Sequence, residues 1–155
     1  MPTTRSGLNS GRLGASATTA DVLPLYGQQL QVVVLSETEF SEHVSEALRY
    51  FHSNNQLLQN PLIRSKFVVQ SSGSEAADAE RVGILKEKIL AAIKAIEESP
   101  VDGKYHRVLY RTFINPVGSQ EKTADFLNMS FSTYRRYLKS GIERLAFRLW
   151  QEEVV

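Results

Sequence analysis

Five basic side chains lie within one short stretch near the C-terminus. Between Ser130 and Arg148 a single acidic residue, Glu143, accompanies the basic residues Arg135, Arg136, Lys139, Arg144 and Arg148. An arginine can donate two hydrogen bonds to a guanine edge, whereas a lysine acts as a point charge for phosphate. Such an excess of positive charge is typical of a nucleic-acid contact, although a solvated helix face can have the same composition.

The excess of basic over acidic residues is confined to the C-terminal third of the chain. Residues 1–100 contain 9 basic and 11 acidic residues, whereas residues 101–155 contain 9 basic and 6 acidic residues. The formal net charge of +1 therefore hides a shift of positive charge toward the C-terminus.

Residue patterns typical of enzymes and metal sites are missing or scattered. The chain has no cysteine, and its histidines, His43, His52 and His106, are too far apart in sequence to form a metal-binding motif. It contains neither a nucleophile elbow nor a GxxxxGK[ST] phosphate loop. The sequence therefore predicts a protein without catalytic activity, metal or cofactor.

Residues 119–149 have the spacing of two helices joined by a tight turn. Ser119 and Ser130 each precede a predicted helix as its N-cap. Asn128 lies where the turn needs a left-handed residue, and Met129 would fill the gap between the helices. The buried faces are expected to consist of Ala124, Phe126, Leu127, Tyr134, Leu138, Ile142, Leu145 and Leu149.

This arrangement leaves one edge of the second helix free to face outward. If the helix enters the major groove of DNA, side chains from its first turns contact bases, and the start of the preceding helix contacts phosphates. Tyr134 and Tyr137 are expected to pack rather than to stack on bases. The candidate groove residues are Phe131, Ser132, Arg135, Arg136 and Lys139, and the candidate backbone contacts are Gln120, Lys122 and Thr123.

From His106 onward, roughly 45 residues resemble the helix-turn-helix of sigma-factor region 4 and of LuxR-type response regulators. The matching residues are Gln120, Glu121, Ala124, Phe126, Leu127, Met129, Ser130, Thr133, Leu138 and Leu145. Asn128 replaces the glycine of those families, and Tyr134 replaces their valine, which indicates a larger pocket beneath the second helix. The resemblance implies a C-terminal DNA-binding domain.

A weaker likeness links the segments LRYFH...NPLIRSKF and FSTYRRYLKSGIERLAFRLW to the C-terminal parts of larger bacterial proteins described as ATPase-associated. Because this chain lacks the phosphate loop, the likeness implies no nucleotide chemistry.

The segments before residue 119 predict further helices and one strand. Residues 1–20 have the composition of a flexible leader, and Leu30–Leu35 form a β-branched run typical of a strand. The strand partner would be Val22–Leu25, a second copy or another polypeptide, and the chain could be a fragment of a longer one. Helices are expected from the capping box at residues 36–39 to about His52, from Asn60-Pro61 through Phe67, over Glu75–Glu98, and from Gly103 through Ile114.

Together these patterns predict a mostly α-helical protein with one short N-terminal strand and a C-terminal helix-turn-helix. The expected parts are a leader at 1–20, a strand with helices at 21–70 and a helical domain at 75–155, with Ser71–Ser74 as the connector. Trp150 is expected to close the core against the helix around Tyr105–Phe113 or to lie in a dimer contact.

The function expected from these features is that of a DNA-binding regulatory protein, acting on double-stranded DNA as a homo-oligomer or tethered to a partner protein. The alternative is a protein-interaction or assembly module of a larger DNA-processing or ATPase machine. No stretch approaches the ~20 apolar residues of a membrane span, and the first 20 residues do not resemble a secretory signal. We therefore expect a cytoplasmic protein that does not enter a membrane.

Overall fold

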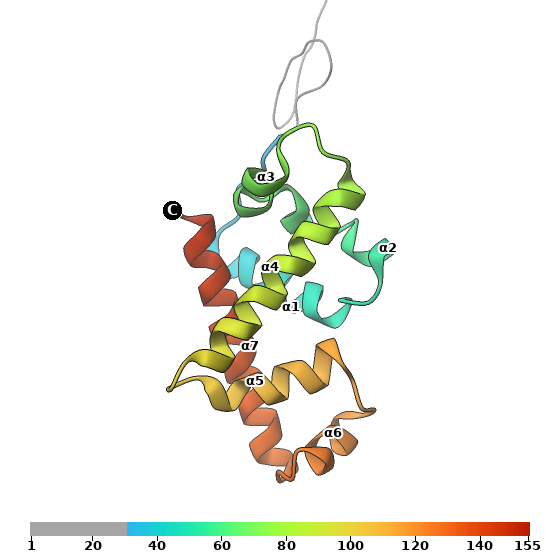
Figure 1. Ribbon diagram of the computed structural model, residues 1–155, viewed down its shortest axis with the longest axis vertical. Helices are drawn as coiled ribbons and strands as arrows, with labels where there is room; N and C mark the ends of the chain where they lie inside the picture. Colours follow the sequence, from blue (N-terminus) through green and yellow to red (C-terminus); the bar gives the residue numbers. More distant parts are fainter. Residues whose placement is uncertain (1–30) are drawn as a thin grey trace, which may run out of the picture. The chain divides into compact units, whose positions relative to one another are not determined.

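The computed structural model describes residues 31–155, and their regular structure is helical (Figure 1). The elements are α1 (Glu37–Arg49), α2 (Asn54–Leu57), the 3-10 helix η2 (Pro61–Arg64), α3 (Lys66–Ser72), α4 (Asp78–Glu98), α5 (Gly103–Leu109), the π-helix η3 (Tyr110–Ile114), α6 (Gln120–Phe126) and α7 (Phe131–Glu153). The prediction of a mostly α-helical protein is confirmed.

The expected strand at residues 30–35 does not form over its described part. Residues 31–36 have no sheet partner, and the backbone N–H of Val33 instead donates to the carbonyl of Arg64 at 2.8 Å. A strand requires a neighbouring strand to satisfy its amides, and within residues 31–155 none is present. Leu30, the segment Val22–Leu25 and the leader at 1–20 lie outside the described residues.

A capping box begins α1, as the sequence predicts. The Ser36 hydroxyl accepts from the N–H of Glu39 at 3.1 Å, and the Glu39 carboxylate accepts from the N–H of Ser36 at 2.9 Å. The backbone hydrogen bond from Ser36, and then the contact with its hydroxyl, lower the pKa of Glu39 below its ordinary value. Because the folded-state pKa is lowered, this cap stabilises the helix at neutral pH and weakens as the pH falls through it. The helix ends at Arg49, shortly before the expected end at His52.

The two parts predicted from the sequence, residues 21–70 and 75–155, share one hydrophobic core in their described residues. Residues 32–155 form a single compact unit, in which side chains of α1, α3, α4, α5 and α7 share a cluster. Phe40 of α1 and Leu145 of α7, for example, are both completely buried in this cluster. The expected boundary at residues 71–74 therefore lies inside one unit, at the end of α3 and the first residues after it, since the helices on both sides need each other to cover their apolar faces.

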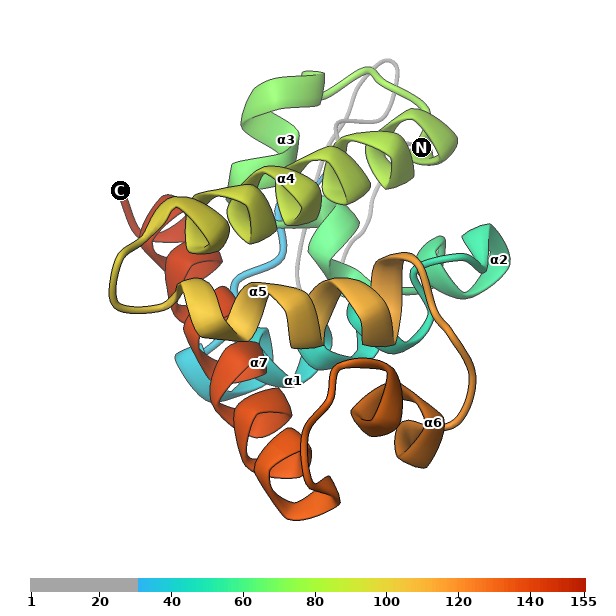
Figure 2. The same ribbon diagram turned by 60° about the horizontal axis from the view of Figure 1, so that its bottom comes forward.

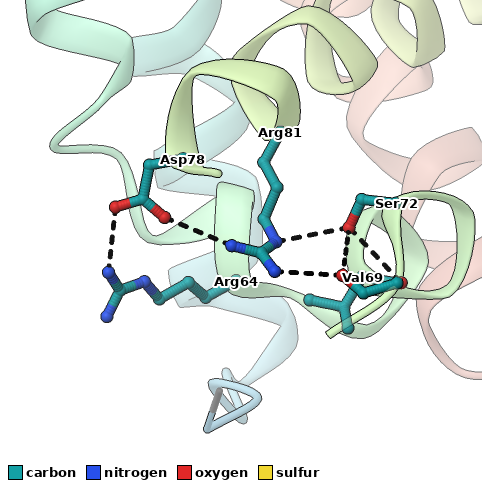
Figure 3. Close-up of polar contacts among 6 residues, drawn as sticks. Arg64, Val69, Ser72, Asp78 and Arg81 are labelled. Atoms are coloured by element: carbon teal, nitrogen blue, oxygen red, sulfur yellow. Dashed lines mark hydrogen bonds and ion pairs between the residues drawn. The ribbon is translucent and has the colours of Figure 1, made fainter. Parts of the chain in front are cut away.

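A buried arginine fixes this turn between α3 and α4 (Figure 3). The side chain of Arg81 is 2% exposed and donates to the Ser72 hydroxyl at 3.2 Å, the Gly73 carbonyl at 3.0 Å and the Asp78 carboxylate at 3.3 Å. Arg64 donates to the other oxygen of the same carboxylate at 3.0 Å, but about half of its side chain is exposed. Gly73 has φ 84°, a conformation that glycine adopts without steric cost.

We expect Arg81→Ala to lower the free energy of unfolding by about 2 kcal/mol, because three charge-assisted hydrogen bonds are lost from a shielded site. Arg64→Ala is the matched control, since it removes the same residue type from the same carboxylate at the surface and should cost less than about 1 kcal/mol. Urea unfolding followed by circular dichroism measures both changes. Equal losses in the two variants would contradict a special role for Arg81.

The last helix, α7, has 23 residues and crosses α5 closely (Figure 2). Gly141 lies at this crossing, where a Cβ atom would come within 3.2 Å of Leu109 Cγ and 3.3 Å of Tyr105 Cβ. The interior glycine weakens the helix by about 1 kcal/mol relative to alanine but permits this close approach.

The far end of α7 packs against α1 and α3. The ring of Trp150 lies 5.3 Å from that of Phe40, and Trp150 packs against the main cluster, to which Tyr105 and Leu109 also belong. The two oxygens of the Glu153 carboxylate accept from the N–H groups of Lys66 and Phe67, at 3.2 Å and 2.9 Å. Because Ser65 provides no side-chain cap for α3, α7 supplies that cap from the other end of the chain.

Candidate nucleic-acid interface

Two capped helices, α6 and α7, are joined by a short turn. The Ser119 hydroxyl accepts from the N–H of Lys122, and the Ser130 hydroxyl accepts from the N–H of Thr133, both at 3.2 Å. Asn128 in the turn has φ 61°, the left-handed conformation expected from the sequence. Both views of the fold place α6 beside the first turns of α7 (Figures 1 and 2).

A second, smaller apolar cluster holds these helices against α5. Its buried members are Val108, Ala124, Leu127, Tyr134 and Leu138, with Met129 half-buried beside them. Tyr134 is completely buried, and its hydroxyl lies 2.7 Å from the Thr112 hydroxyl of η3. The expected packing role of Tyr134 is confirmed, and its hydroxyl has the partner that a buried phenol needs.

Phe126 departs from the expected buried face of α6. Its side chain is 56% exposed, and the Arg111 guanidinium lies over its ring at 4.9 Å. Because Ala124 and Leu127 already fill the contact beneath α6, the ring of Phe126 is directed to the surface instead.

The five candidate groove residues share the outward edge of α7. Phe131, Ser132, Arg135, Arg136 and Lys139 are all exposed. The guanidinium of Arg135 lies 5.6 Å from the Phe131 ring centroid, and that of Arg136 lies 5.5 Å from the Tyr137 ring centroid. These contacts restrict two otherwise flexible side chains near the start of the helix.

Within residues 31–155 the two arginines and Lys139 form no ion pair. Among the described residues, neither they nor Lys122 of α6 lie within salt-bridge distance of a carboxylate. Arg144, further along α7, is instead paired with Asp102 at 3.1 Å. Within residues 31–155 the cations without an ion pair thus include a group on α6 and the start of α7, and elsewhere Arg49, Lys86, Lys104, Arg107, Arg111 and Arg148.

Of the three candidate backbone contacts on α6, two are accessible. Gln120 and Lys122 are exposed, but Thr123 is 1% exposed, and its hydroxyl donates to the Ser119 carbonyl at 2.8 Å. The prediction that Thr123 contacts a phosphate is therefore wrong for this conformation. Thr123 belongs to the inner face of a seven-residue helix and supports its cap.

A groove of about 690 Å³ runs along the candidate edge, and its other wall is α1. Gln120, Arg135, Arg136 and Lys139 line it together with Thr38, Ser41, Glu42, Ser45, Leu138, Ile142 and Glu143. The α1 residues are absent from the sequence-based set because nothing in the local pattern of Glu37–Arg49 indicates that it packs beside α7, which begins 82 residues after α1 ends. Only the spacing of Thr38, Ser41 and Ser45 in α1 could have suggested it.

The structure offers no competing metal centre within residues 31–155, since no group of three potential ligands comes together there. The histidines have separate partners: His43 lies near Glu46, His52 donates to the Ile114 carbonyl at 2.8 Å, and His106 lies near Glu97. In the same range, no helix combines the length and apolar character needed to cross a membrane.

The chain matches no family model, no curated protein and no solved structure. Its class therefore rests on the geometry described above: a mostly α-helical unit with an exposed, unpaired basic edge.

Proposed function

We propose that α6, the turn and α7 form a DNA-binding helix-turn-helix, and that the protein acts as a DNA-binding regulator. The observation that carries this proposal is the edge of α7, where Arg135, Arg136 and Lys139 are exposed and have no ion-pair partner in the described part of the chain. Exposed cations on the first turns of a capped helix are what contact with a polyanion requires. The resemblance to sigma-factor region 4 and LuxR-type regulators supports the same assignment.

The residue types in this interface are suited to different contacts with DNA. Arg135 and Arg136 are suited to guanine edges or to paired phosphate oxygens, while Lys139 and Lys122 provide point charges for phosphates. Phe131 holds the guanidinium of Arg135 outward and adds an apolar contact at the first turn. Gln120 and Ser132 supply neutral hydrogen bonds.

A single small module of this kind binds DNA weakly, because nonspecific affinities are typically about 10⁻⁴–10⁻⁶ M. We therefore propose that the protein works as a homo-oligomer or tethered to a partner protein, in the cytoplasm. Two copies would double the number of phosphate contacts and could read two half-sites.

A second function, as an assembly module of a larger DNA-processing or ATPase machine, is favoured by two other exposed rings. Phe126 and Phe147 are each 56% exposed, and Arg111 contacts the first of them. Aromatic and arginine side chains are enriched in protein interfaces. Loss of a protein partner on changing Phe126 or Phe147, with DNA binding unaffected, would support this alternative.

The test of the DNA proposal is the salt dependence of binding to a fluorescent duplex, measured by anisotropy at 50 and 200 mM salt. If about four cations displace counterions, the affinity should fall on the order of 100-fold between these concentrations. A chain that does not bind duplex DNA at the lower concentration, or binds with an affinity independent of salt, rules out this function.

A further inference from the structure

Three hydroxyl groups form a stripe along the face of α1 that borders the groove. Thr38, Ser41 and Ser45 are three and four residues apart, the spacing that places side chains on one face of a helix. All three line the groove opposite the basic edge of α7. Within residues 31–155 none of these three hydroxyls makes a hydrogen bond, whereas the N-cap hydroxyls of Ser36, Ser53, Ser119 and Ser130 each accept one from a backbone N–H.

The opposite wall carries the unpaired cations. Arg135, Arg136 and Lys139 face the same groove, so cations lie on one side and neutral donors on the other. A chain of phosphates matches this pair of walls, because each phosphate accepts both charge-assisted and neutral hydrogen bonds. Serine and threonine hydroxyls are common phosphate contacts in protein–DNA interfaces.

We propose that the hydroxyl stripe of α1, defined by Thr38, Ser41 and Ser45, is a second wall of the DNA interface and donates hydrogen bonds to backbone phosphates beside α7. This inference rests on the proposed function and extends the interface to three side chains that lie at least 90 residues before Arg135 in the chain. The stripe fixes the position of the duplex against α7, whereas the cations supply most of the salt-dependent attraction.

Two carboxylates in the groove oppose the entry of the DNA backbone. Glu42 and Glu143 line the same groove and can only accept hydrogen bonds, so they repel phosphate. Glu42 lies on α1 among the three hydroxyls, so it opposes phosphate at the stripe itself. For the same reason Glu42→Gln should raise the affinity for duplex DNA severalfold at low salt.

The test compares the intact chain with a Thr38→Val/Ser41→Ala/Ser45→Ala variant in the same anisotropy measurement. Removing three neutral donors should lower the affinity roughly 10-fold and leave the slope of log affinity against log salt unchanged, since no counterion is involved. Lys139→Gln should instead reduce the magnitude of that slope by about 1. Ser71→Ala/Ser74→Ala, at exposed positions of the connector, is the matched control and should bind as the intact chain does.

A Ser41→Thr/Ser45→Thr variant separates contact from helix stability. It keeps both hydroxyls while lowering helix propensity, so it should retain affinity to within about twofold. An intact chain that binds DNA together with a triple variant of equal affinity would overturn the α1 proposal alone. If the intact chain does not bind duplex DNA, the proposed function and this extension both fail.

Discussion

Changing Arg135 and Arg136 together to alanine is expected to weaken duplex binding on the order of 100-fold at about 100 mM salt. Each exposed arginine contributes about 1–3 kcal/mol when it contacts a base or phosphate, and neither is needed for an ion pair within the described residues. The double variant should also reduce the magnitude of the salt slope by about 2, which anisotropy titrations at several salt concentrations would measure.

The control for this variant removes the same charge elsewhere. Arg49 and Lys94 are exposed on α1 and α4 and do not line the groove, so Arg49→Ala/Lys94→Ala should bind almost as the intact chain does. A loss for one DNA sequence alone would indicate that the arginines read bases, and a uniform loss would indicate phosphate contacts. Equal losses in the variant and in its control would show that only net charge matters and that the α7 edge is not the interface.

We expect Tyr134→Ala to lower the free energy of unfolding by about 3–5 kcal/mol. The side chain is completely buried in the cluster beneath α6 and α7, where no neighbouring element can close the cavity without moving α7. Since small domains have total stabilities of about 5–15 kcal/mol, such a loss is a large part of the total. Urea titration monitored by circular dichroism and by Trp150 fluorescence would measure it.

Tyr134→Phe isolates the hydroxyl from the ring. It keeps the packing but leaves the Thr112 hydroxyl without its partner at 2.7 Å, so it should cost about 1 kcal/mol. A phenylalanine variant as unstable as the alanine variant would mean that the hydrogen bond, rather than the ring, anchors α7. Comparable stability of all three proteins would show that the second cluster does not hold α7 in place.

Local patterns were sufficient to predict the caps and turns. The capping box at Ser36 and Glu39, the N-caps Ser119 and Ser130, and the left-handed Asn128 depend on neighbours within four residues, and all are present. The buried stripe of α4 also follows from periodicity, because a helix of 21 residues repeats it several times.

Features that depend on distant partners could not be predicted in the same way. The run before α1 has strand propensity, but in the described residues its amide at Val33 finds a helical segment rather than a second strand. Phe126 is a large apolar residue that was assigned to a buried face, but its ring is exposed and lies under Arg111 of another element. A seven-residue helix such as α6 has too few turns for periodicity to separate Thr123 from its exposed neighbours.

In the candidate site, too, the residues that follow a local pattern were predicted and those brought in by a tertiary contact were not. The outward edge of α7 was predicted from periodicity, and its five residues are exposed. The contribution of α1 was not, since the packing of α1 beside α7 is a tertiary contact that no local spacing encodes. The DNA-binding role itself remains a proposal on which the affinity measurements above decide.

The length of α7 ties the candidate interface to the stability of the whole unit. Its first half lies in the small cluster with Tyr134 and Leu138, and its second half lies in the main core with Leu145 and Leu149. A fragment containing only α6 and the start of α7 would therefore lack half of the packing that supports α7. If α7 binds a duplex as proposed, thermodynamic linkage requires that the bound duplex stabilise the main core, and that a partner which loosens the core lower the affinity for DNA by the same factor.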